Sequence, residues 1–366
     1  MSERLGFRVG LHVGQMLQRI PGGIGRYLGV LARCLSEEGL DVVPFAAGPR
    51  PAALADTDSY VDLGRPHGSV RYELWHHFRR PALALDVDVV HAPSLAVPPT
   101  GSTPLVVTVH DLAFLRLPQY FTIRGLRFHE RGLRLAREHA AAVIVPSDFV
   151  AGELIAEGFA ADRVHVAHHG IDDPGDRPPL GVSSVAERLG LTSRYVLFVG
   201  TLEPRKGIDT LIEGFRLLRR TAPDLQLALV GPRGWGKLPR LDRPGVVQVG
   251  QITDDDLDAL YRGALALAYP SEYEGFGLPA LEAMVRGCPV VTSAATSLPE
   301  VVGDAGRLVP TQDPGALSAA LAEIIDDPAE RERLGAAGRE RAQQFTWGAS
   351  VQAHVAAYRV AAGRSS

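Results

Sequence analysis

The sequence is poor in cysteine and lysine, and it lacks any long hydrophobic run. Its two cysteines, Cys34 and Cys288, are far apart and have no metal-like spacing to other cysteines or to histidines. This excludes a disulfide scaffold and a zinc knuckle, and it fits a reducing cytosol. No apolar run approaches the roughly 20 residues that span a bilayer, and the first residues lack the apolar core of a signal peptide. We therefore expect a cytoplasmic protein, at most peripheral on the inner face of a membrane.

A basic excess is also missing. The 38 lysines and arginines are outnumbered by 42 aspartates and glutamates, and the net charge of −4 argues against a nucleic-acid binder. Only Lys206 and Lys237 are lysines, a bias that a GC-rich genome explains but that draws attention to each of them. With 366 residues, 46% hydrophobic and 22% charged, the chain has the size and composition of a globular protein of about two domains.

Short apolar runs alternate with helical stretches, and this rhythm occurs twice along the chain. Most of the runs are continuously apolar, as buried parallel strands are, and stretches such as 208–220 and 257–263 between them have helical spacing. The pattern predicts an α/β fold with two Rossmann-like, doubly wound parallel-sheet domains that face a cleft. The expected strands are 7–13, 41–45, 87–91, 105–110, 142–146 and 163–167, followed by 195–199, 226–230, 246–249, 265–269, 289–292 and 306–309.

The domain boundary is expected in a polar, proline-rich stretch at residues 172–179, which can continue neither a helix nor a central strand. We predict a first domain over 1–173, a linker over 174–190, a second domain over 191–345 and a C-terminal helix over 346–366. Ligands of such sheets bind at the carboxyl ends of the strands, so each domain can contribute half of one site.

A candidate phosphate-binding loop follows the first strand of the second domain and runs from Gly200 to Gly207. It contains Arg205 and Lys206 directly before a predicted helix start. Full charges, hydrogen-bond donors and the helix dipole would coincide there and favour phosphate. A solvated pair of surface charges is the alternative.

A second loop of the same domain runs from Ser271 to Glu282 and leads into a helix. Its two carboxylates, Glu274 and Glu282, have seven residues between them and can face different sets of hydroxyls on one ligand. Surface charge is the alternative for such a pair. The backbone amides that point out of the helix start belong to Gly275, Phe276, Gly277 and Leu278.

Two features of the first domain complete the candidate set. Gly22 and Gly23 open a helix, where glycine lets a backbone approach a ligand closely, although an ordinary flexible loop is the alternative. The spacing to the preceding strand is too long for a dinucleotide fingerprint. His110 ends the 105–110 strand and is expected to point into the cleft, with a structural histidine as the alternative.

Together these residues resemble the GT-B fold retaining glycosyltransferases of the glycogen-synthase-like group, glycosyltransferase family 4, over nearly the whole chain. The family's Glu-(seven residues)-Glu signature is similar to Glu274 and Glu282, and its Arg-Lys pair to Arg205-Lys206. Its N-terminal Gly-Gly loop is similar to residues 22–23, and the segments 145–149, 170–172 and 345–347 also match. The resemblance implies an acceptor-binding first domain, a nucleotide-sugar donor-binding second domain, and a C-terminal helix that packs back on the first.

The resemblance also implies a role for each matching residue. Arg205 and Lys206, in the loop that Gly200 opens, would bind the donor diphosphate together with the amides of residues 275–278. Glu274 would position the hydroxyls of the donor sugar, and Glu282 would hold the nucleotide ribose. His110 would lie beside the anomeric carbon, and the loop at 22–23 would close on the phosphate and the acceptor side.

The resemblance implies a retaining hexosyltransferase in which the leaving phosphate itself assists attack on the face from which it departs, so no carboxylate nucleophile is needed. No cofactor is expected beside the nucleotide-sugar donor. Residues 109–114 look most like the mannosyltransferase-like members, which favours GDP-mannose as donor and a glycan, lipid-linked or small-molecule acceptor; UDP-sugars remain open. The alternatives are a nucleotide-sugar 2-epimerase or a phosphorylase on the same fold, or a non-catalytic nucleotide-sugar-binding subunit.

Two charged segments of the chain each allow a structural and a functional interpretation. Residues 254–256 are three aspartates, and with Thr253 as a cap they predict the first turn of a helix rather than a metal site, so we expect metal-independent activity. Residues 114–139 hold six arginines and two glutamates, a net +4. A basic helix face here would suit an anionic acceptor or peripheral membrane contact, with a solvated face as the alternative. Its arginines, three or four residues apart, are Arg124, Arg127, Arg131 and Arg134.

Overall fold

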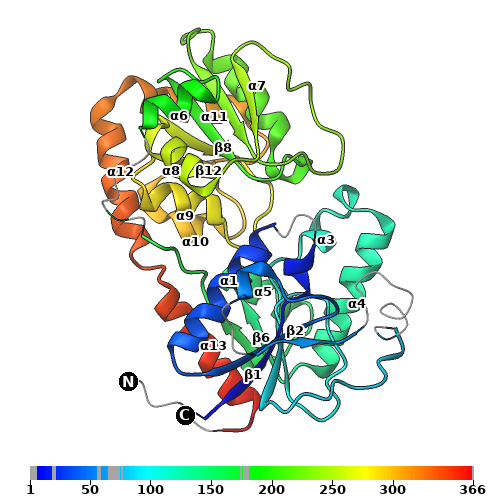
Figure 1. The fold of residues 1–366 in the computed structure, drawn as a ribbon. Helices are drawn as coiled ribbons and strands as arrows, with labels where there is room; N and C mark the ends of the chain where they lie inside the picture. The colour runs from blue at the N-terminus through cyan, green and yellow to red at the C-terminus, as the bar shows by residue number, and fades with distance from the viewer. Residues whose placement is uncertain are drawn as a thin grey trace. The chain divides into compact units, whose positions relative to one another are not determined.

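The chain folds into two compact units, each with its own parallel β-sheet (Figure 1). The structure, a computed structural model, describes residues 6–18, 22–55, 59–64, 75, 77–173, 175 and 181–364. The first unit comprises Met1–Leu112, Ile123–Gly170 and Trp347–Ser366, and the second comprises Ala113–Thr122 and Ile171–Thr346. The predicted fold class, two doubly wound α/β domains, is confirmed.

The sheet of the first unit has seven strands in the order β3-β2-β1-β4-β5-β6-β7. Strand β1 lies between β2 and β4, so the strand order reverses there, as in other doubly wound folds. All six strands expected in this half are present, and the two-residue edge strand β3 is an addition. The bounds are β1 Arg8–His12, β2 Asp41–Ala46, β3 Val61–Asp62, β4 Val89–Ala92, β5 Leu105–Thr108, β6 Ala142–Val145 and β7 Val164–Val166.

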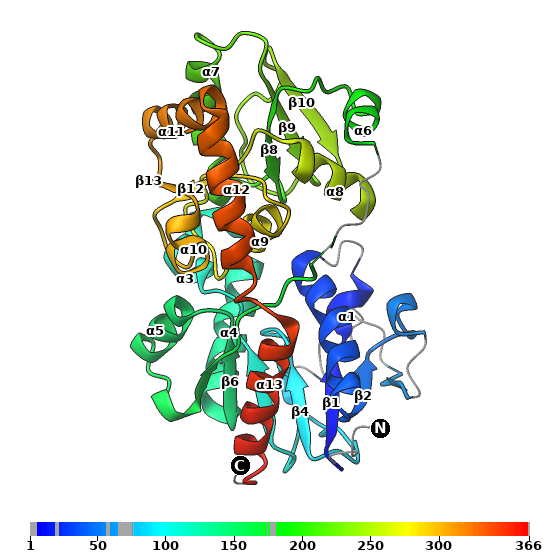
Figure 2. The same cartoon turned by 90° about the vertical axis from the view of Figure 1, so that its left-hand side faces the viewer.

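Helices from both ends of the chain share the core of the first unit. The first long helix, α1 (Gly22–Glu37), buries Leu28, Leu31 and Leu35 at helical spacing against the same core as Val351 and Val355 of α13 (Trp347–Ala361). Figure 2 shows α13 within this unit, as expected for the C-terminal helix. Further helices described in this unit are the 3₁₀ turns η1 Gly14–Leu17, η2 Ala52–Leu54 and η4 Ala161–Arg163, with α4 Ile123–His139 and α5 Asp148–Ala156.

The sheet of the second unit has six strands in the order β10-β9-β8-β11-β12-β13, and its order reverses between β8 and β11. Every residue of β8 and β11 is buried, which explains why the sequence there is continuously apolar. The bounds are β8 Tyr195–Val199, β9 Gln226–Val230, β10 Val246–Gly250, β11 Ala266–Tyr269, β12 Val290–Ser293 and β13 Arg307–Val309.

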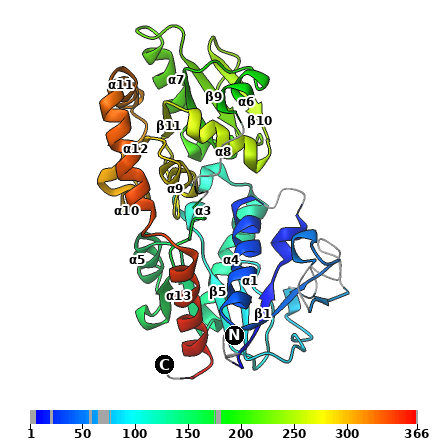
Figure 3. The ribbon, with the colours of Figure 1, turned by 60° about the vertical axis from the view of Figure 1, so that its left-hand side comes forward.

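Helices pack on both sides of this second sheet. The pairs α7–α11 and α9–α12 are in contact (Figure 3). The 3₁₀ turns are η3 Pro118–Tyr120, η5 Pro204–Lys206 and η6 Gly303–Ala305. The α-helices are α3 Ala113–Arg116, α6 Val182–Arg188, α7 Ile208–Leu218, α8 Asp254–Gly263, α9 Leu278–Val285, α10 Leu298–Val302, α11 Pro314–Asp326 and α12 Pro328–Ala342.

Two segments of the second unit lie outside the range 191–345 predicted for the second domain. Helix α6 falls within the predicted linker, yet its Val185 and Ala186 are buried in the core of this unit. The segment that carries Tyr120 comes from the first half of the chain. The phenol of Tyr120 donates a hydrogen bond to Glu272 (3.2 Å). The backbone carbonyl oxygen of Tyr120 accepts a hydrogen bond from the indole of Trp235 (2.7 Å).

No helix in the described part of the chain is both long and apolar enough to cross a bilayer.

Candidate active site

The carboxyl ends of β8 and β11 hold the candidate site of the second unit. The strand order reverses between these two strands, which is where doubly wound sheets bind their ligands. The loop after β8 carries Arg205 and Lys206, and the loop after β11 carries Glu274. The side chains that the sequence analysis selected from separate loops therefore come together.

A buried ion pair joins the two loops. The ammonium Nζ of Lys206 lies 2.5 Å from Oε1 of Glu274, and only 8% and 7% of these residues are exposed. The phenol of Tyr269 bonds to both, at 2.8 Å each, and the hydroxyl of Ser271 donates to the same carboxylate oxygen (2.7 Å). Buried charges persist when they are paired and hydrogen-bonded in this way.

The pair keeps Glu274 in its ionised form. Burial alone would raise the pKa of Glu274, but Lys206 and Arg205 outweigh it, so the pKa lies below its usual value. Burial, together with the neighbouring Arg205, lowers the pKa of Lys206, and Glu274 opposes that change. Glu274 is thus a carboxylate that accepts hydrogen bonds and has no proton to donate.

A second carboxylate, missed in the sequence analysis, holds Arg205. Oε1 of Glu203 lies 2.7 Å from Nε of Arg205, and Glu203 is only 2% exposed. Nη1 of Arg205 donates to the carbonyl of Tyr273 (3.2 Å) and lies 3.8 Å from Oε2 of Glu274. In the sequence, Glu203 stands out only by its place two residues before Arg205. An acidic residue in a predicted phosphate-binding loop gave no reason to select it.

Two helices begin directly at these loops. Helix α7 starts at Ile208, and the residue before it, Gly207, has a left-handed φ of 69°. Lys206 therefore lies directly before the start of a helix, as predicted. Helix α9 starts at Leu278 after Gly277, whose φ is 105°. The amides of residues 275–278 therefore lie at a helix N-terminus, where the dipole favours negative charge. Phe276 packs edge-on against Phe345 and anchors this loop.

Glu282 lies one turn into α9 and is also buried. Its Oε2 accepts a hydrogen bond from the phenol of Tyr261 on α8 (2.9 Å). Burial, reinforced by this carboxylate, raises the pKa of Tyr261 well above its usual value, so the phenol keeps its proton and donates it. A contact between Glu282 and a ribose stays a prediction.

The aspartates at residues 254–256 form the first turn of α8, as predicted. The Thr253 side chain accepts a hydrogen bond from the amide of Asp256 (3.2 Å), and Asp256 pairs with Arg188 at 2.5 Å. The capped helix start accounts for the run of three acids, and Asp256 has Arg188 as its partner.

The predicted residues of the first unit lie near the carboxyl end of β5 and at the start of α1. Strand β5 ends at Thr108 rather than at His110, so His110 lies two residues into the following loop and not on the strand. Its Nε2 donates to the carbonyl oxygen of Pro93 (2.9 Å), and burial lowers its pKa. Gly22 and Gly23 form the exposed first turn of α1, and a Cβ atom on either would meet no other atom within 4 Å.

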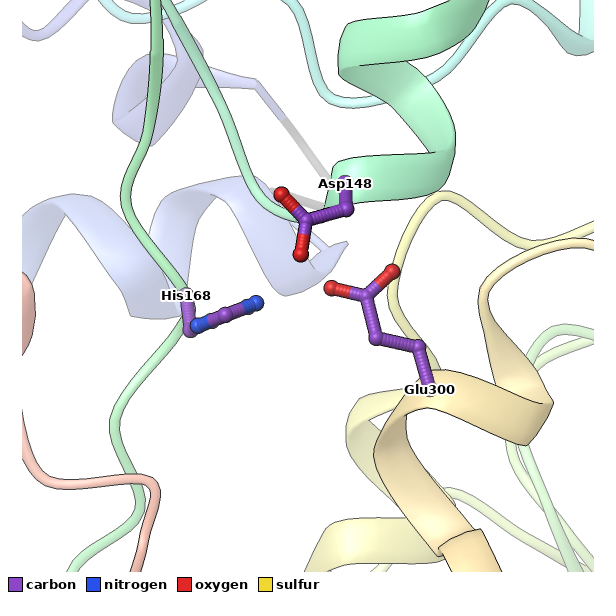
Figure 4. A group of neighbouring side chains, drawn as sticks. All are labelled: Asp148, His168 and Glu300. Atoms are coloured by element: carbon purple, nitrogen blue, oxygen red, sulfur yellow. The ribbon is translucent and has the colours of Figure 1, made fainter.

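Two other features of the chain are not part of this site. A cavity of about 790 Å³ in the first unit, lined by Arg79, Thr103 and His139 among others, lies at the amino ends of β5 and β6, the edge opposite to His110. Figure 4 shows Asp148 and His168 of the first unit with Glu300 of the second. These three come from separate units, so we build no metal site from them.

Comparisons with known proteins agree with this arrangement. A model of the Glycosyltransferase Family 4 matches residues 21–173, and a model of Glycosyl transferases group 1 matches residues 184–341. O-antigen chain mannosyltransferase B of Escherichia coli is 36% identical over 298 residues, which cover 78% of each chain. D-inositol 3-phosphate glycosyltransferase of Salinispora arenicola is 35% identical over 289 residues, or 70% of this chain and 63% of that protein.

Solved structures share the fold. The Anabaena protein Alr3699/HepE, in complex with UDP and glucose, superimposes with a TM-score of 0.73 at 20% identity, over 96% of this chain and 98% of that one. Sequence and fold thus agree: the chain is a glycosyltransferase and belongs to family 4, with the GT-B fold.

Proposed function

We propose that this glycosyltransferase transfers mannose from GDP-mannose, with retention of the anomeric configuration, to a glycan, lipid-linked or small-molecule acceptor. The observation that carries the proposal is the cluster of Arg205, Lys206 and Glu274 beside the start of α9. The 36% identity to a mannosyltransferase supports the choice of sugar.

The cluster suits a nucleoside diphosphate sugar. Two cations and the amides of residues 275–278 can neutralise and bind the diphosphate, with Gly200 giving its backbone room to approach. Glu274, an ionised acceptor, can bind the sugar hydroxyls, and Glu282 the ribose. Donors that are fixed before the reaction stabilise the charge that develops on the leaving phosphate.

The bonding of Glu274 argues against a covalent glycosyl-enzyme, and the proposal of retention therefore rests on the family resemblance and on same-face attack. Oε1 of Glu274 already accepts hydrogen bonds from Lys206, Tyr269 and Ser271, which makes it a poor nucleophile. In the reaction we propose, the acceptor oxygen bonds to the anomeric carbon as the bond from that carbon to the phosphate breaks on the same face. The acceptor's proton passes to the leaving phosphate.

His110 can serve this reaction as a neutral acceptor. Its lowered pKa favours the uncharged imidazole, and the bond from Nε2 to Pro93 leaves Nδ1 as the ring atom with a lone pair. We infer that Nδ1 accepts a hydrogen bond from a sugar hydroxyl near the anomeric carbon. Gly22 and Gly23, exposed at the start of α1, suit a backbone that closes on phosphate and acceptor.

A UDP-sugar is the alternative donor, because the Anabaena protein of the same fold binds UDP and glucose. A phosphorylase of the glycogen type fits less well, since it needs a lysine for pyridoxal phosphate. Lys206 is paired with Glu274, and Lys237 is exposed in the loop after β9. A nucleotide-sugar 2-epimerase would convert the donor into its C2 epimer without forming a glycoside, and a non-catalytic subunit would leave the donor unchanged.

The transfer is tested by offering the protein GDP-mannose, UDP-glucose and GDP-glucose with a panel of glycan and lipid-linked acceptors. We expect release of GDP from GDP-mannose at the highest rate, and NMR of the product should show an α-mannoside from the α-linked donor. EDTA should leave the rate unchanged, because Arg205 and Lys206 replace a metal at the diphosphate. A β-linked product would overturn retention, and loss on chelation that manganese restores would overturn metal independence.

We also propose that α4 contacts an anionic acceptor or membrane surface. Its buried face consists of Gly132, Leu133, Leu135 and Ala136, and its remaining surface is basic. Ile123 and Phe128 are 71% and 46% exposed on the same helix, an arrangement typical of peripheral membrane helices. Of the four arginines at three- and four-residue spacing, Arg124, Arg127 and Arg134 are exposed, whereas Arg131 donates to the carbonyl of His77.

Co-sedimentation with anionic liposomes at increasing salt tests this contact. Each cation near the surface contributes about 1 kcal/mol, so the double variant Arg127→Glu, Arg134→Glu should bind at least about tenfold more weakly at low salt. The matched control is Arg220→Glu, Arg240→Glu, which makes the same charge change at exposed positions of the second unit. Equal binding by both variants, or no binding by the wild type, would contradict a membrane role for α4.

A further inference from the structure

A chain of buried hydrogen bonds links α13 to α1 and to two central strands of the first unit. The phenol of Tyr27 on α1 lies 2.6 Å from Nε2 of His354 on α13 and also bonds to the hydroxyl of Thr108 on β5. Thr108 lies 2.7 Å from Nε2 of His91 on β4, and Nδ1 of His91 lies 2.8 Å from the phenol of Tyr358, again on α13. The chain therefore begins and ends on the C-terminal helix.

The direction of every bond in this chain follows from its ends. The carbonyl oxygen of Ser350 can only accept, so Nδ1 of His354 donates to it (2.7 Å). Burial lowers the pKa of His354 to about 4, so the ring is neutral at pH 7 and its Nε2 accepts from Tyr27. The phenol oxygen of Tyr27 in turn accepts from Thr108.

The remaining bonds run the same way. Thr108 accepts from Nε2 of His91, and burial lowers the pKa of His91 well below its usual value, so this ring is also neutral. Its Nδ1 accepts from Tyr358. Bonds that all point in one direction polarise and strengthen one another.

Tyr27 is the member of this chain that contacts the candidate site. Its ring meets the imidazole of His110 edge-on, with centroids 5.2 Å apart and planes at 85°. The centroid of the same ring lies 4.9 Å from that of the His169 imidazole, and the centroids of His169 and His110 are 5.5 Å apart. His110 is thus held by Pro93 at Nε2 and by these two rings at its side.

We propose that Tyr27 is a positioning residue for His110, and that His354 on the C-terminal helix fixes Tyr27 for this task. The proposal rests on the proposed role of His110 beside the donor sugar. The hydroxyl of Tyr27 anchors one end of the ring, which keeps the ring nearly perpendicular to the imidazole of His110. Without the hydroxyl the ring keeps its size but loses both of its buried hydrogen bonds.

The test compares Tyr27→Phe with Tyr358→Phe. Each variant removes one phenol oxygen from the same hydrogen-bonded chain and leaves one buried histidine nitrogen without its donor, but Tyr358 has no ring contact with His110. We expect both variants to lose thermal stability, and Tyr27→Phe to lose more, because it removes two buried hydrogen bonds and Tyr358→Phe removes one. In Tyr27→Phe, kcat for transfer should fall roughly 10- to 100-fold with an unchanged KM for the donor, because a small misplacement near the reacting atoms is costly. In Tyr358→Phe, kcat should stay within about threefold of the wild type.

A double-mutant cycle separates positioning from general damage. If Tyr27 acts through His110, Tyr27→Phe should lower kcat no further in a His110→Ala background. The ¹⁵N resonances of the His110 imidazole should shift in Tyr27→Phe and not in Tyr358→Phe, and this signal needs no substrate. Equal kcat losses in the two variants, additive losses in the cycle, or unchanged His110 resonances would overturn the positioning role. A shift of the resonances in a protein without transfer activity would instead refute the proposed function and leave the positioning intact.

Discussion

Replacing Lys206 by alanine should lower the rate of transfer by about 100-fold or more. Lys206 supplies a full charge where the donor diphosphate is proposed to bind, and a fixed charge-assisted donor at a leaving group is worth about 3 kcal/mol. The substitution also removes the closer of the two cations beside buried Glu274, which should cost about 3 kcal/mol of unfolding free energy. Initial rates and thermal unfolding measure the two effects separately.

The other lysine provides the matched control. Lys237→Ala changes the net charge equally but removes an exposed side chain, so we expect wild-type stability and a rate within about twofold of the wild type. Lys206→Arg keeps the positive charge beside Glu274 and should retain most of the stability. A lower rate of transfer in this stable variant would reflect an altered phosphate contact and not a damaged fold. A folded Lys206→Ala protein with wild-type turnover would remove Lys206 from the donor site.

Gly207→Ala should destabilise the second unit and disconnect its two functional loops. The φ of Gly207 is 69°, and a Cβ atom there would overlap the carbonyl oxygen of Pro270, directly after β11. Strain and overpacking together should cost about 3 kcal/mol or more, measured by chemical denaturation. Because the loops carrying Lys206 and Glu274 would have to move apart, the rate of transfer should fall as well.

Gly190→Ala separates backbone strain from the overlap. Gly190 has a similar φ of 79° in the same unit, but its Cβ would meet no atom within 4 Å. Its substitution should cost only the strain of about 1 to 2 kcal/mol and leave the rate unchanged. Equal losses of stability in the two variants would show that the contact with Pro270 does not hold the loops together.

The sequence was informative wherever a structural rule is local. Buried parallel strands are continuously apolar, so the expected strands all appear in the structure, and the cap at Thr253 followed from its place before three aspartates. The edge strand β3 has only two residues, half-buried Val61 and exposed Asp62, and so leaves no pattern to read. Helix α6 was assigned to the linker, because a proline-rich stretch lies directly before it.

The site was predictable only in part, because its support comes from residues distant in sequence. Arg205, Lys206 and Glu274 lie in short loops whose chemistry is visible in one dimension. Tyr269 reads as a core residue of β11, and only the folded chain shows its phenol between the lysine and the glutamate. The bond between Tyr27 and His354 joins residues 327 positions apart, and no local pattern could indicate it.

A crystal structure of the protein with GDP-mannose tests most directly whether the loops after β8 and β11 form the donor site. The account predicts the diphosphate within hydrogen-bond distance of Arg205 and Lys206 and at the start of α9, with the sugar hydroxyls at Glu274. Phosphates bound elsewhere, for example in the cavity lined by Arg79 and His139, with Lys206 still paired only to Glu274, would contradict it.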